Sequence, residues 1–354
     1  MARDMTKGRI LPQMTAFAIP LILGNLFQIL YNATDSIIVG KFVGDDALAA
    51  VGTAGPIMNM AILFISGMCM GAGILMSTLY GAKDMKNLEK QISTTLIGGL
   101  VFSLLIAFLM IVFAVPILRL INSPEEIIGS AAIYLRVVFL GLIFTFVYNF
   151  LANTLRALGD SRTPLYFLVI SAFLNVAGDL LFVVTLKLGV MGSAVATVLS
   201  EALCCVCCGI YVKLKVPVLC LGKKWRVFER RVLWKTFSYG ITSALQQMCV
   251  QLGKILVQAI INVQGVAFIA AFTAINRVDD FVLSPEGNIA HATTTFIAQN
   301  RGAGDVERVK KGYRCGIIME LIFSVAVSII VFFAAAPLMK MFVAEDSAEV
   351  VALG

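Results

Sequence analysis

The sequence predicts an all-α membrane protein, and its composition, its hydropathy and the spacing of its charges all indicate this fold class. Hydrophobic residues make up 59% of the 354 residues and charged residues only 14%, whereas charged residues approach about 25% of a soluble domain. The mean hydropathy is +0.92. Long apolar runs alternate with short charged loops, and about 20 apolar residues suffice to cross a bilayer as a helix. We therefore expect a polytopic helical bundle whose first partner is the lipid bilayer.

Nine apolar runs are long enough to span the membrane. They cover residues 11–40, 47–79, 91–119, 127–155, 163–187, 190–213, 234–262, 267–299 and 312–342. The residues leading to Gly354 have the composition of the approach to a further span. The first run is too long for a signal-peptide core and lacks a small-residue cleavage site, so we expect it to remain as a membrane anchor.

The charge of the loops predicts the orientation of the chain. Short loops that carry many lysines and arginines are retained on the cytoplasmic side of the membrane. Most of the 28 basic residues lie in the N-terminal segment and in the loops after the second, fourth, sixth and eighth runs. The opposite side carries four, which are Lys41, Arg119, Lys187 and Lys340. We therefore expect a multi-pass protein of a bacterial inner (cytoplasmic) membrane with a cytoplasmic N-terminus. Anionic lipid facing these loops accounts for the net charge of +7 without a nucleic-acid partner.

An internal repeat divides the chain. A Gly-Ala-x-Asp turn follows the second run at Gly81 and the eighth run at Gly302, a separation of 221 residues. Pro116 and Pro337, in the third and ninth runs, have the same separation. The first three helices therefore recur as helices seven to nine. Because each repeat has an even number of helices, both copies enter the membrane in the same direction, which makes the repeats parallel.

The repeat sets the expected domain boundaries. We expect a six-helix N-terminal lobe over residues 1–221 and a partial C-terminal lobe of three helices over residues 222–354. The basic segment 213–235 links them. The second six-helix repeat is then incomplete, and about nine helices are present. Substrate sites of such transporters commonly lie between or within the repeats.

Acidic side chains inside the first lobe indicate where ions bind. Asp35 lies in an apolar run, where a charge costs about 3 kcal/mol or more. Asn175 and Asp179 are four residues apart and share one helix face. Counting helical rise places Asp35, Asp179 and Thr197 roughly 7 to 12 Å below the outer surface. Two nearby carboxylates cannot both ionise cheaply, so one holds a proton or a cation neutralises the pair. Their oxygens also suit a small hard cation such as Na⁺, bound transiently.

Several motifs resemble those of a known family. They are Leu30-Tyr31-Asn32 with Asp35, Val39-Gly40, the segment 47–52, the segment 155–160 with Thr163-Pro164, Asn175 with Asp179, and Gln299-Asn300 before Gly302. Together they resemble the MATE (multidrug and toxic compound extrusion) transporters over essentially the whole chain. The resemblance implies twelve helices in two six-helix lobes, of which this chain carries nine. We accordingly do not expect a chain of this length to transport by itself.

The resemblance also implies roles for particular residues. In the family, the first-lobe coupling site uses residues that match Asp35, Asn175, Asp179 and Thr197, and the proline that matches Pro20 is associated with bending of the first helix. A proline removes a helical hydrogen bond, which is consistent with such a bend. In some members helix seven carries a coupling glutamate, but Met248 stands at that position here. The alternative is that Asp35 and Asp179 only fix helix packing.

Other polar residues are candidates to line a substrate cavity. They are Asn25, Gln28, Tyr31 and Asn32 in the first lobe, and Gln246, Gln247, Glu286 and His291 in the second. For each of them, interhelical hydrogen bonding is an equally open interpretation. The roles of Glu201 and Glu320 are left open. Cys204, Cys205, Cys207 and Cys208 crowd one helix without histidine partners, so we expect packing there and no resident metal or other cofactor.

Three functions remain to be compared. We expect a secondary antiporter, monomeric, that exports amphipathic or cationic organic compounds in exchange for H⁺ or Na⁺ by alternating access. A flippase for lipid-linked oligosaccharides is an alternative of similar architecture, but it should show a large cationic cavity. A membrane receptor or scaffold that does not transport is the third, and it would make the interior acids dispensable. The glycine-rich turns lack the Walker pattern, and no nucleophile–base arrangement indicates an enzyme.

Overall fold

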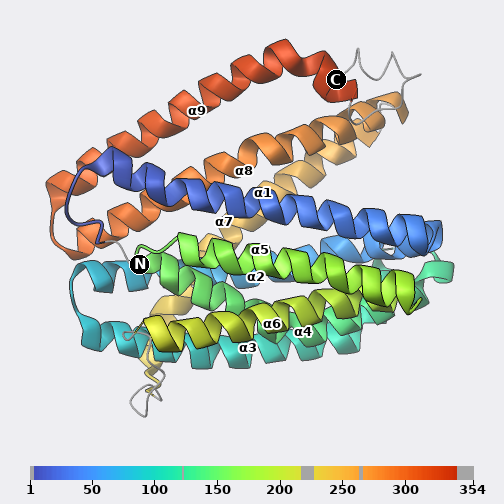
Figure 1. Cartoon of the computed structure of the whole chain (residues 1–354), viewed down its shortest axis with the longest axis horizontal. Helices are drawn as coiled ribbons and strands as arrows, with labels where there is room; N and C mark the ends of the chain where they lie inside the picture. Colours follow the sequence, from blue (N-terminus) through green and yellow to red (C-terminus); the bar gives the residue numbers. More distant parts are fainter. Residues whose placement is uncertain (1–3, 122, 217–226, 263–265, 341–354) are drawn as a thin grey trace.

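The computed structural model describes residues 4–121, 123–216, 227–262 and 266–340, which form a bundle of long helices (Figure 1). Its α-helices are α1 (Ile10–Phe42), α2 (Asp45–Gly81), α3 (Met85–Leu120), α4 (Glu125–Ala157), α5 (Arg162–Asp179), α6 (Val190–Lys215), α7 (Arg230–Asn262), α8 (Val266–Gly302) and α9 (Val306–Lys340). A π-helical segment, η1 (Leu180–Thr185), continues α5. The described residues contain no strand. The expected boundary between residues 221 and 222 lies outside the described residues.

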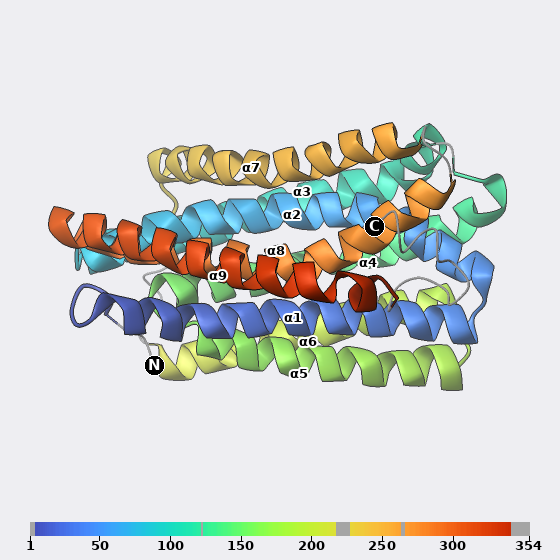
Figure 2. The ribbon, with the colours of Figure 1, turned by 90° about the horizontal axis from the view of Figure 1, so that it is seen from above.

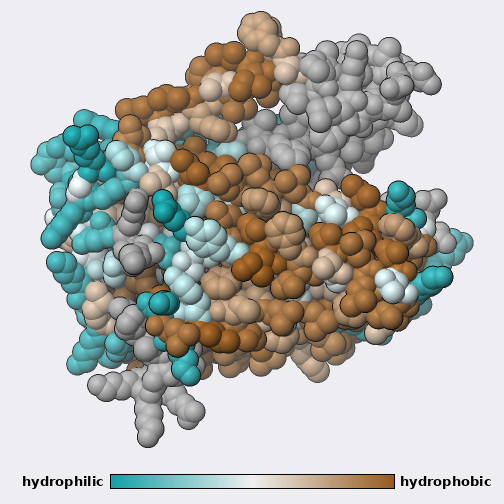
Figure 3. Space-filling view, viewed as in Figure 1, coloured by the Kyte–Doolittle hydropathy of each residue, from teal (hydrophilic) through white to brown (hydrophobic). Residues whose placement is uncertain are grey.

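The all-α membrane fold class is confirmed. Seven of the described helices, α1 to α6 and α9, are long and apolar enough to cross a bilayer. Figure 3 shows a broad hydrophobic belt between two hydrophilic ends of the bundle. Helices α7 and α8 have 33 and 37 residues and run alongside the others (Figure 2). We call the end that carries the α2–α3, α4–α5 and α8–α9 turns the basic end, because Lys83, Arg162 and Arg301 are exposed there.

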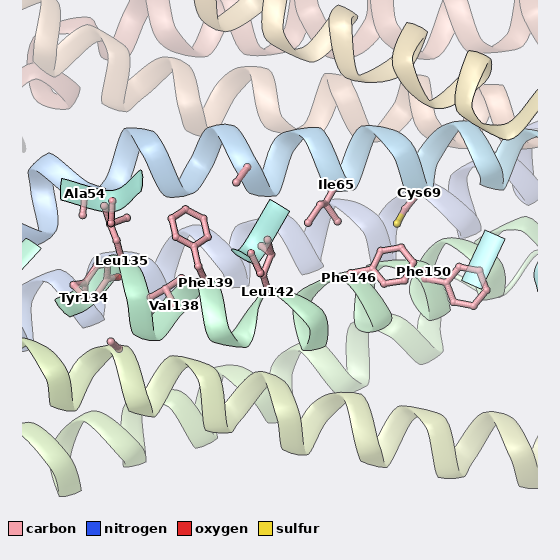
Figure 4. Close-up of a cluster of buried hydrophobic side chains, with 14 of the residues drawn as sticks. Ala54, Ile65, Cys69, Tyr134, Leu135, Val138, Phe139, Leu142, Phe146 and Phe150 are labelled. Atoms are coloured by element: carbon pink, nitrogen blue, oxygen red, sulfur yellow. The ribbon is translucent and has the colours of Figure 1, made fainter. Parts of the chain in front are cut away.

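Helix α4 forms the centre of the first lobe. It begins after Pro124 with two acidic residues in its first turn, which favour the positive end of the helix dipole. Its side chains Leu135, Phe139 and Leu142 are at most 1% exposed. They point toward α2, where Ala54 and Ile65 lie (Figure 4). This close packing fixes the frame on which the polar residues of α1, α5 and α6 are held.

We expect Phe139→Ala to lower the free energy of unfolding by about 3 kcal/mol, because the truncation leaves a cavity in this packed cluster. Phe173 on α5 provides a matched control, since 70% of its surface is exposed on the outside of the bundle. Phe173→Ala should change stability much less. Chemical unfolding of both variants in detergent micelles measures the difference. Equal losses in the two variants would contradict the packing described for α4.

The two Gly-Ala-x-Asp turns adopt the same structure. In each turn the third residue has a left-handed backbone, with φ of 57° at Lys83 and 78° at Gly304. In each, the aspartate then caps the next helix: Asp84 accepts a hydrogen bond from the Asn87 amide, and Asp305 accepts one from the Arg308 amide. Hydrogen bonds from Asn87 hold the pKa of Asp84 below its usual range. The repeat found in the sequence is therefore also a structural repeat at these two turns.

These turns also meet one another across the lobes. A Cβ atom added to Gly81 would lie 1.8 Å from the carbonyl oxygen of Gln299, and one added to Gly302 would lie 1.9 Å from that of Thr78. Thr78 and Gln299 are themselves separated by the repeat length of 221 residues. The contact is therefore reciprocal: each glycine of the pair lies against the equivalent residue of the other repeat. Only glycine permits this approach of two backbones.

Further contacts hold the lobes together near the basic end. Met5, Met14 and Phe17 pack with Ile289 and Phe296 of α8 in one buried cluster. Backbone bonds strengthen it, since the Met5 amide donates to Gln299 Oε1 and Arg308 donates to the Met5 carbonyl. From this end α8 and α9 diverge from α1 toward the opposite end (Figure 1).

The second interlobe contact is between α2 and α7. Gly67 lies against Ala244, and Gly71 lies against Gly240, so closely that a Cβ atom on either α2 glycine would meet the α7 backbone within 2.7 Å. Small residues on facing helices allow this approach in membrane bundles. Helix α1 of the first repeat thus packs on α8 of the second, and α7 of the second packs on α2 of the first. In both cases the first helix of one repeat packs on the second helix of the other, which is the symmetry that two related repeats produce.

A candidate cation site in the first lobe

The first-lobe acids meet between α1 and the end of α5. Asp179 is the last α-helical residue of α5 and has no exposed surface. The carboxyl groups of Asp35 and Asp179 lie close enough to each other to interact electrostatically. Neither oxygen of Asp179 receives a hydrogen bond from an N–H or O–H donor of the described residues. A proton shared by the two carboxyls, or a bound cation, would compensate for this burial.

The wider π-helical turn follows Asp179 directly. Segment η1 extends from Leu180 to Thr185, and the Leu186 amide closes it by donating to the Leu181 carbonyl. Such single π-turns are rare and occur frequently at functional sites. Here the turn begins at the residue after the buried carboxylate.

Helix α6 supplies the remaining polar groups. Ser193 donates a hydrogen bond of 2.7 Å to Asp35 Oδ1, and Asn175 Nδ2 donates one of 3.1 Å to Thr197 Oγ1. The Asn175 side-chain oxygen is buried and has no donor among the described residues. Three buried oxygens, one from Asn175 and two from Asp179, thus lie unpaired on one face of α5. Hard oxygen ligands of this kind suit H⁺ or a small cation, and the residues present fit such an ion.

The structure brings together the four residues that the sequence placed in one site, Asp35, Asn175, Asp179 and Thr197. Helical spacing explains it, since Asn175 and Asp179 are four residues apart on α5. Ser193 was missed by the sequence analysis. It lies four residues before Thr197 on α6, so the same spacing argument identifies it once Thr197 is chosen.

The other first-lobe candidates lie along α1. Tyr31 is partly buried. Gln28 and Asn32 are exposed and Asn25 is partly buried. Pro20 is buried inside α1, which runs without interruption from Ile10 to Phe42 in this conformation. These residues therefore extend along the helix from the site, toward the basic end.

The second-lobe candidates lie elsewhere. Glu286 accepts a hydrogen bond of 2.5 Å from Ser324 of α9. His291 lines a small polar cavity of about 20 Å³ with Arg156 near the basic end, large enough for about one water molecule. Gln246 is exposed and Gln247 partly buried on α7. In the part of the chain that the structure describes, no hydrogen bond or ion pair joins any of these four residues to Asp35 or Asp179.

Long apolar helices in two related repeats, with buried unpaired oxygens in one lobe, are typical of polytopic membrane transporters. The MatE family model matches residues 20–181 and 242–354. The chain therefore belongs to the MATE family, a family of transporters and not of enzymes.

Curated relatives agree with this assignment. The chain is 30% identical over 350 residues to the probable multidrug resistance protein YoeA of Bacillus subtilis, covering 96% of this chain and 75% of that protein. It is 31% identical over 311 residues to the probable multidrug resistance protein YpnP of the same organism, covering 87% and 69%. The multidrug export protein MepA of Staphylococcus aureus is 22% identical over 92% of this chain and 71% of its own length.

Solved structures show the same fold. A MOP superfamily transporter from Pyrococcus furiosus, described as having reversed polarity of its binding pocket, has a TM-score of 0.89 and 25% identity over 98% of this chain and 77% of its own. An outward-facing MATE family transporter has a TM-score of 0.90 and 24% identity, over 99% and 78%. Both alignments cover the two lobes.

Proposed function

We propose that the protein is a secondary antiporter that exports amphipathic, cationic organic compounds in exchange for H⁺ or Na⁺. The observation that carries the proposal is the pairing of partly buried Asp35 with fully buried Asp179, whose two oxygens lack a donor among the described residues. An ion that enters the pair neutralises it, and an empty pair favours the cationic group of a substrate electrostatically. The names of the relatives, multidrug resistance and multidrug export proteins, support the substrate class.

The contacts between the lobes support alternating access. The described interlobe contacts of α1 with α8 and the reciprocal Gly81–Gly302 contact lie at the basic end. We propose that this end faces the cytoplasm, because it carries the basic turns, and that the protein acts as a monomer. The conformation is then closed to the cytoplasm, and the site lies on the extracellular half of the first lobe. Ion binding and substrate release would take place in this state.

The test uses everted membrane vesicles that contain the full-length protein. Ethidium, a cationic amphipathic dye, serves as the probe, and its transport is measured with a proton gradient alone and with a sodium gradient alone. We expect transport with one of the two gradients and none when both are dissipated. A protein that moved ethidium equally well without any gradient, or that moved lipid-linked sugar in place of ethidium, would contradict the antiporter proposal.

A further inference from the structure

A third carboxyl group lies in the first lobe and is not explained by the Asp35–Asp179 pair. Glu201 is on α6, four residues beyond Thr197. Its side-chain oxygen Oε2 accepts a hydrogen bond from the Thr145 hydroxyl of α4. Within the described residues, Glu201 takes part in no ion pair. A carboxylate in the membrane interior without a cation is costly, so this group also needs a proton or a cation.

Glu201 continues a regular series of polar residues on α6. Ser193, Thr197 and Glu201 follow one another at intervals of four residues and therefore share one helix face. Each bonds to a different helix: Ser193 to Asp35 of α1, Thr197 to Asn175 of α5, and Glu201 to Thr145 of α4. The eight residues from Ser193 to Glu201 correspond to a rise of about 12 Å toward the basic end.

Tyr31 connects the two acidic positions. It lies four residues before Asp35 on α1, one helical turn nearer the basic end. Its hydroxyl interacts electrostatically with both Glu201 and Asp35. Other ionisable groups close enough to interact electrostatically with Glu201 are Tyr134 of α4 and Cys204 and Cys205 of α6 itself. None of these three groups carries a positive charge.

We infer that Glu201 is a second proton-binding site of the first lobe, placed inward of the Asp35–Asp179 pair and electrostatically linked to it through the surroundings of Tyr31. The inference rests on the proposed antiport function and extends it, because it assigns a proton to a group outside the four residues of the candidate site. A proton at Glu201 neutralises this partly buried carboxyl, whose carbonyl oxygen accepts the Thr145 hydrogen bond. The only chemical step is the binding of one proton by one carboxylate.

Infrared difference spectroscopy of the purified full-length protein, between acidic and alkaline pH, detects this proton as a carbonyl stretching band of a carboxylic acid. We expect Glu201→Gln to remove one such band. Thr145→Val should keep the band but shift its frequency, because the hydrogen bond to the carboxyl is lost. Ser200→Ala is the matched control, since the Ser200 hydroxyl donates to the carbonyl of Thr197 in its own helix.

The variants also separate this inference from the proposed function. In a double variant, Asp35→Asn with Asp179→Asn, the Glu201 band should persist although ion-coupled efflux is lost. If Glu201→Gln leaves every carboxylic acid band in place, or if Thr145→Val does not move the band, the inference is overturned while antiport through the aspartates stands. Should Glu201→Gln fail to fold, the Thr145→Val spectrum and the Glu201→Asp variant, which keeps a carboxyl, still decide the question.

Discussion

Replacing Asp179 by asparagine is expected to reduce ion-driven ethidium efflux by at least about tenfold, which corresponds to about 1.4 kcal/mol. Asparagine has the shape of aspartate, but its amide carries no charge and does not take up a proton at the pH of a transport assay. Asp179 is fully buried, interacts electrostatically with Asp35 and has no donor among the described residues, so we expect its charge state to control ion binding at the site. The Asp179→Asn protein should therefore fold and bind substrate but no longer exchange it for the ion.

Efflux from everted vesicles and ethidium binding to the purified protein measure the two parts of this prediction separately. Asp84→Asn is the matched control, because it makes the same chemical change in the α2–α3 turn, where asparagine caps a helix as well as aspartate does. It should transport as the unaltered protein does. Wild-type efflux by Asp179→Asn would show that the pair serves only helix packing, the alternative that the sequence left open.

Gly81→Ala is expected to stop transport by preventing the basic ends of the lobes from closing. The added methyl group would lie 1.8 Å from the Gln299 carbonyl oxygen, and a backbone atom cannot move aside as a flexible side chain does. Gly302→Ala should have the same effect, because its methyl group would meet the Thr78 carbonyl oxygen. We expect efflux to fall by at least about tenfold in either variant, since a shift of 1.4 kcal/mol in the closing equilibrium suffices for that change.

Distances between spin labels on Lys86 and Glu307, both exposed near the basic end, report the closing directly in a background without native cysteines. The distance should increase in Gly81→Ala and Gly302→Ala. Gly52→Ala is the control on the same helix, because a Cβ atom there meets nothing within 4 Å. An unchanged distance together with normal efflux in Gly81→Ala would show that the reciprocal contact is not required for the transport cycle.

Much of the fold could be predicted because the bilayer imposes simple rules on a sequence. Helices α1 to α9 begin and end within a few residues of the nine apolar runs, except that α3 and α9 begin six residues earlier, in the polar turns, and that α5 passes into η1. Polar residues stabilise those added turns, as Asp84 does at the start of α3. The four residues of the candidate site could be predicted from helical spacing and family resemblance, because carboxylates are rare in a membrane interior.

The remaining contacts required the structure because hydroxyl groups in apolar helices carry little information. Most of them donate to their own helix, as Thr34 and Ser77 do. Ser193 and Thr145 instead donate to acids on other helices, and only the packing of α6 against α1 and α4 decides this. The pairing of Glu286 with Ser324 likewise depends on how α8 and α9 cross. Sequence spacing along one helix cannot give a contact between two.

Helix α1 connects two regions that the transport cycle must coordinate. Near one end its residue Asp35 is bonded to α6, and near the other end Met14 and Phe17 are packed on α8 of the second lobe. Its 33 residues form a rod about 50 Å long without a break. In the proposed transport cycle, a tilt of this rod at Asp35 would therefore also move the residues that pack on the second lobe, so that one helix couples the two regions.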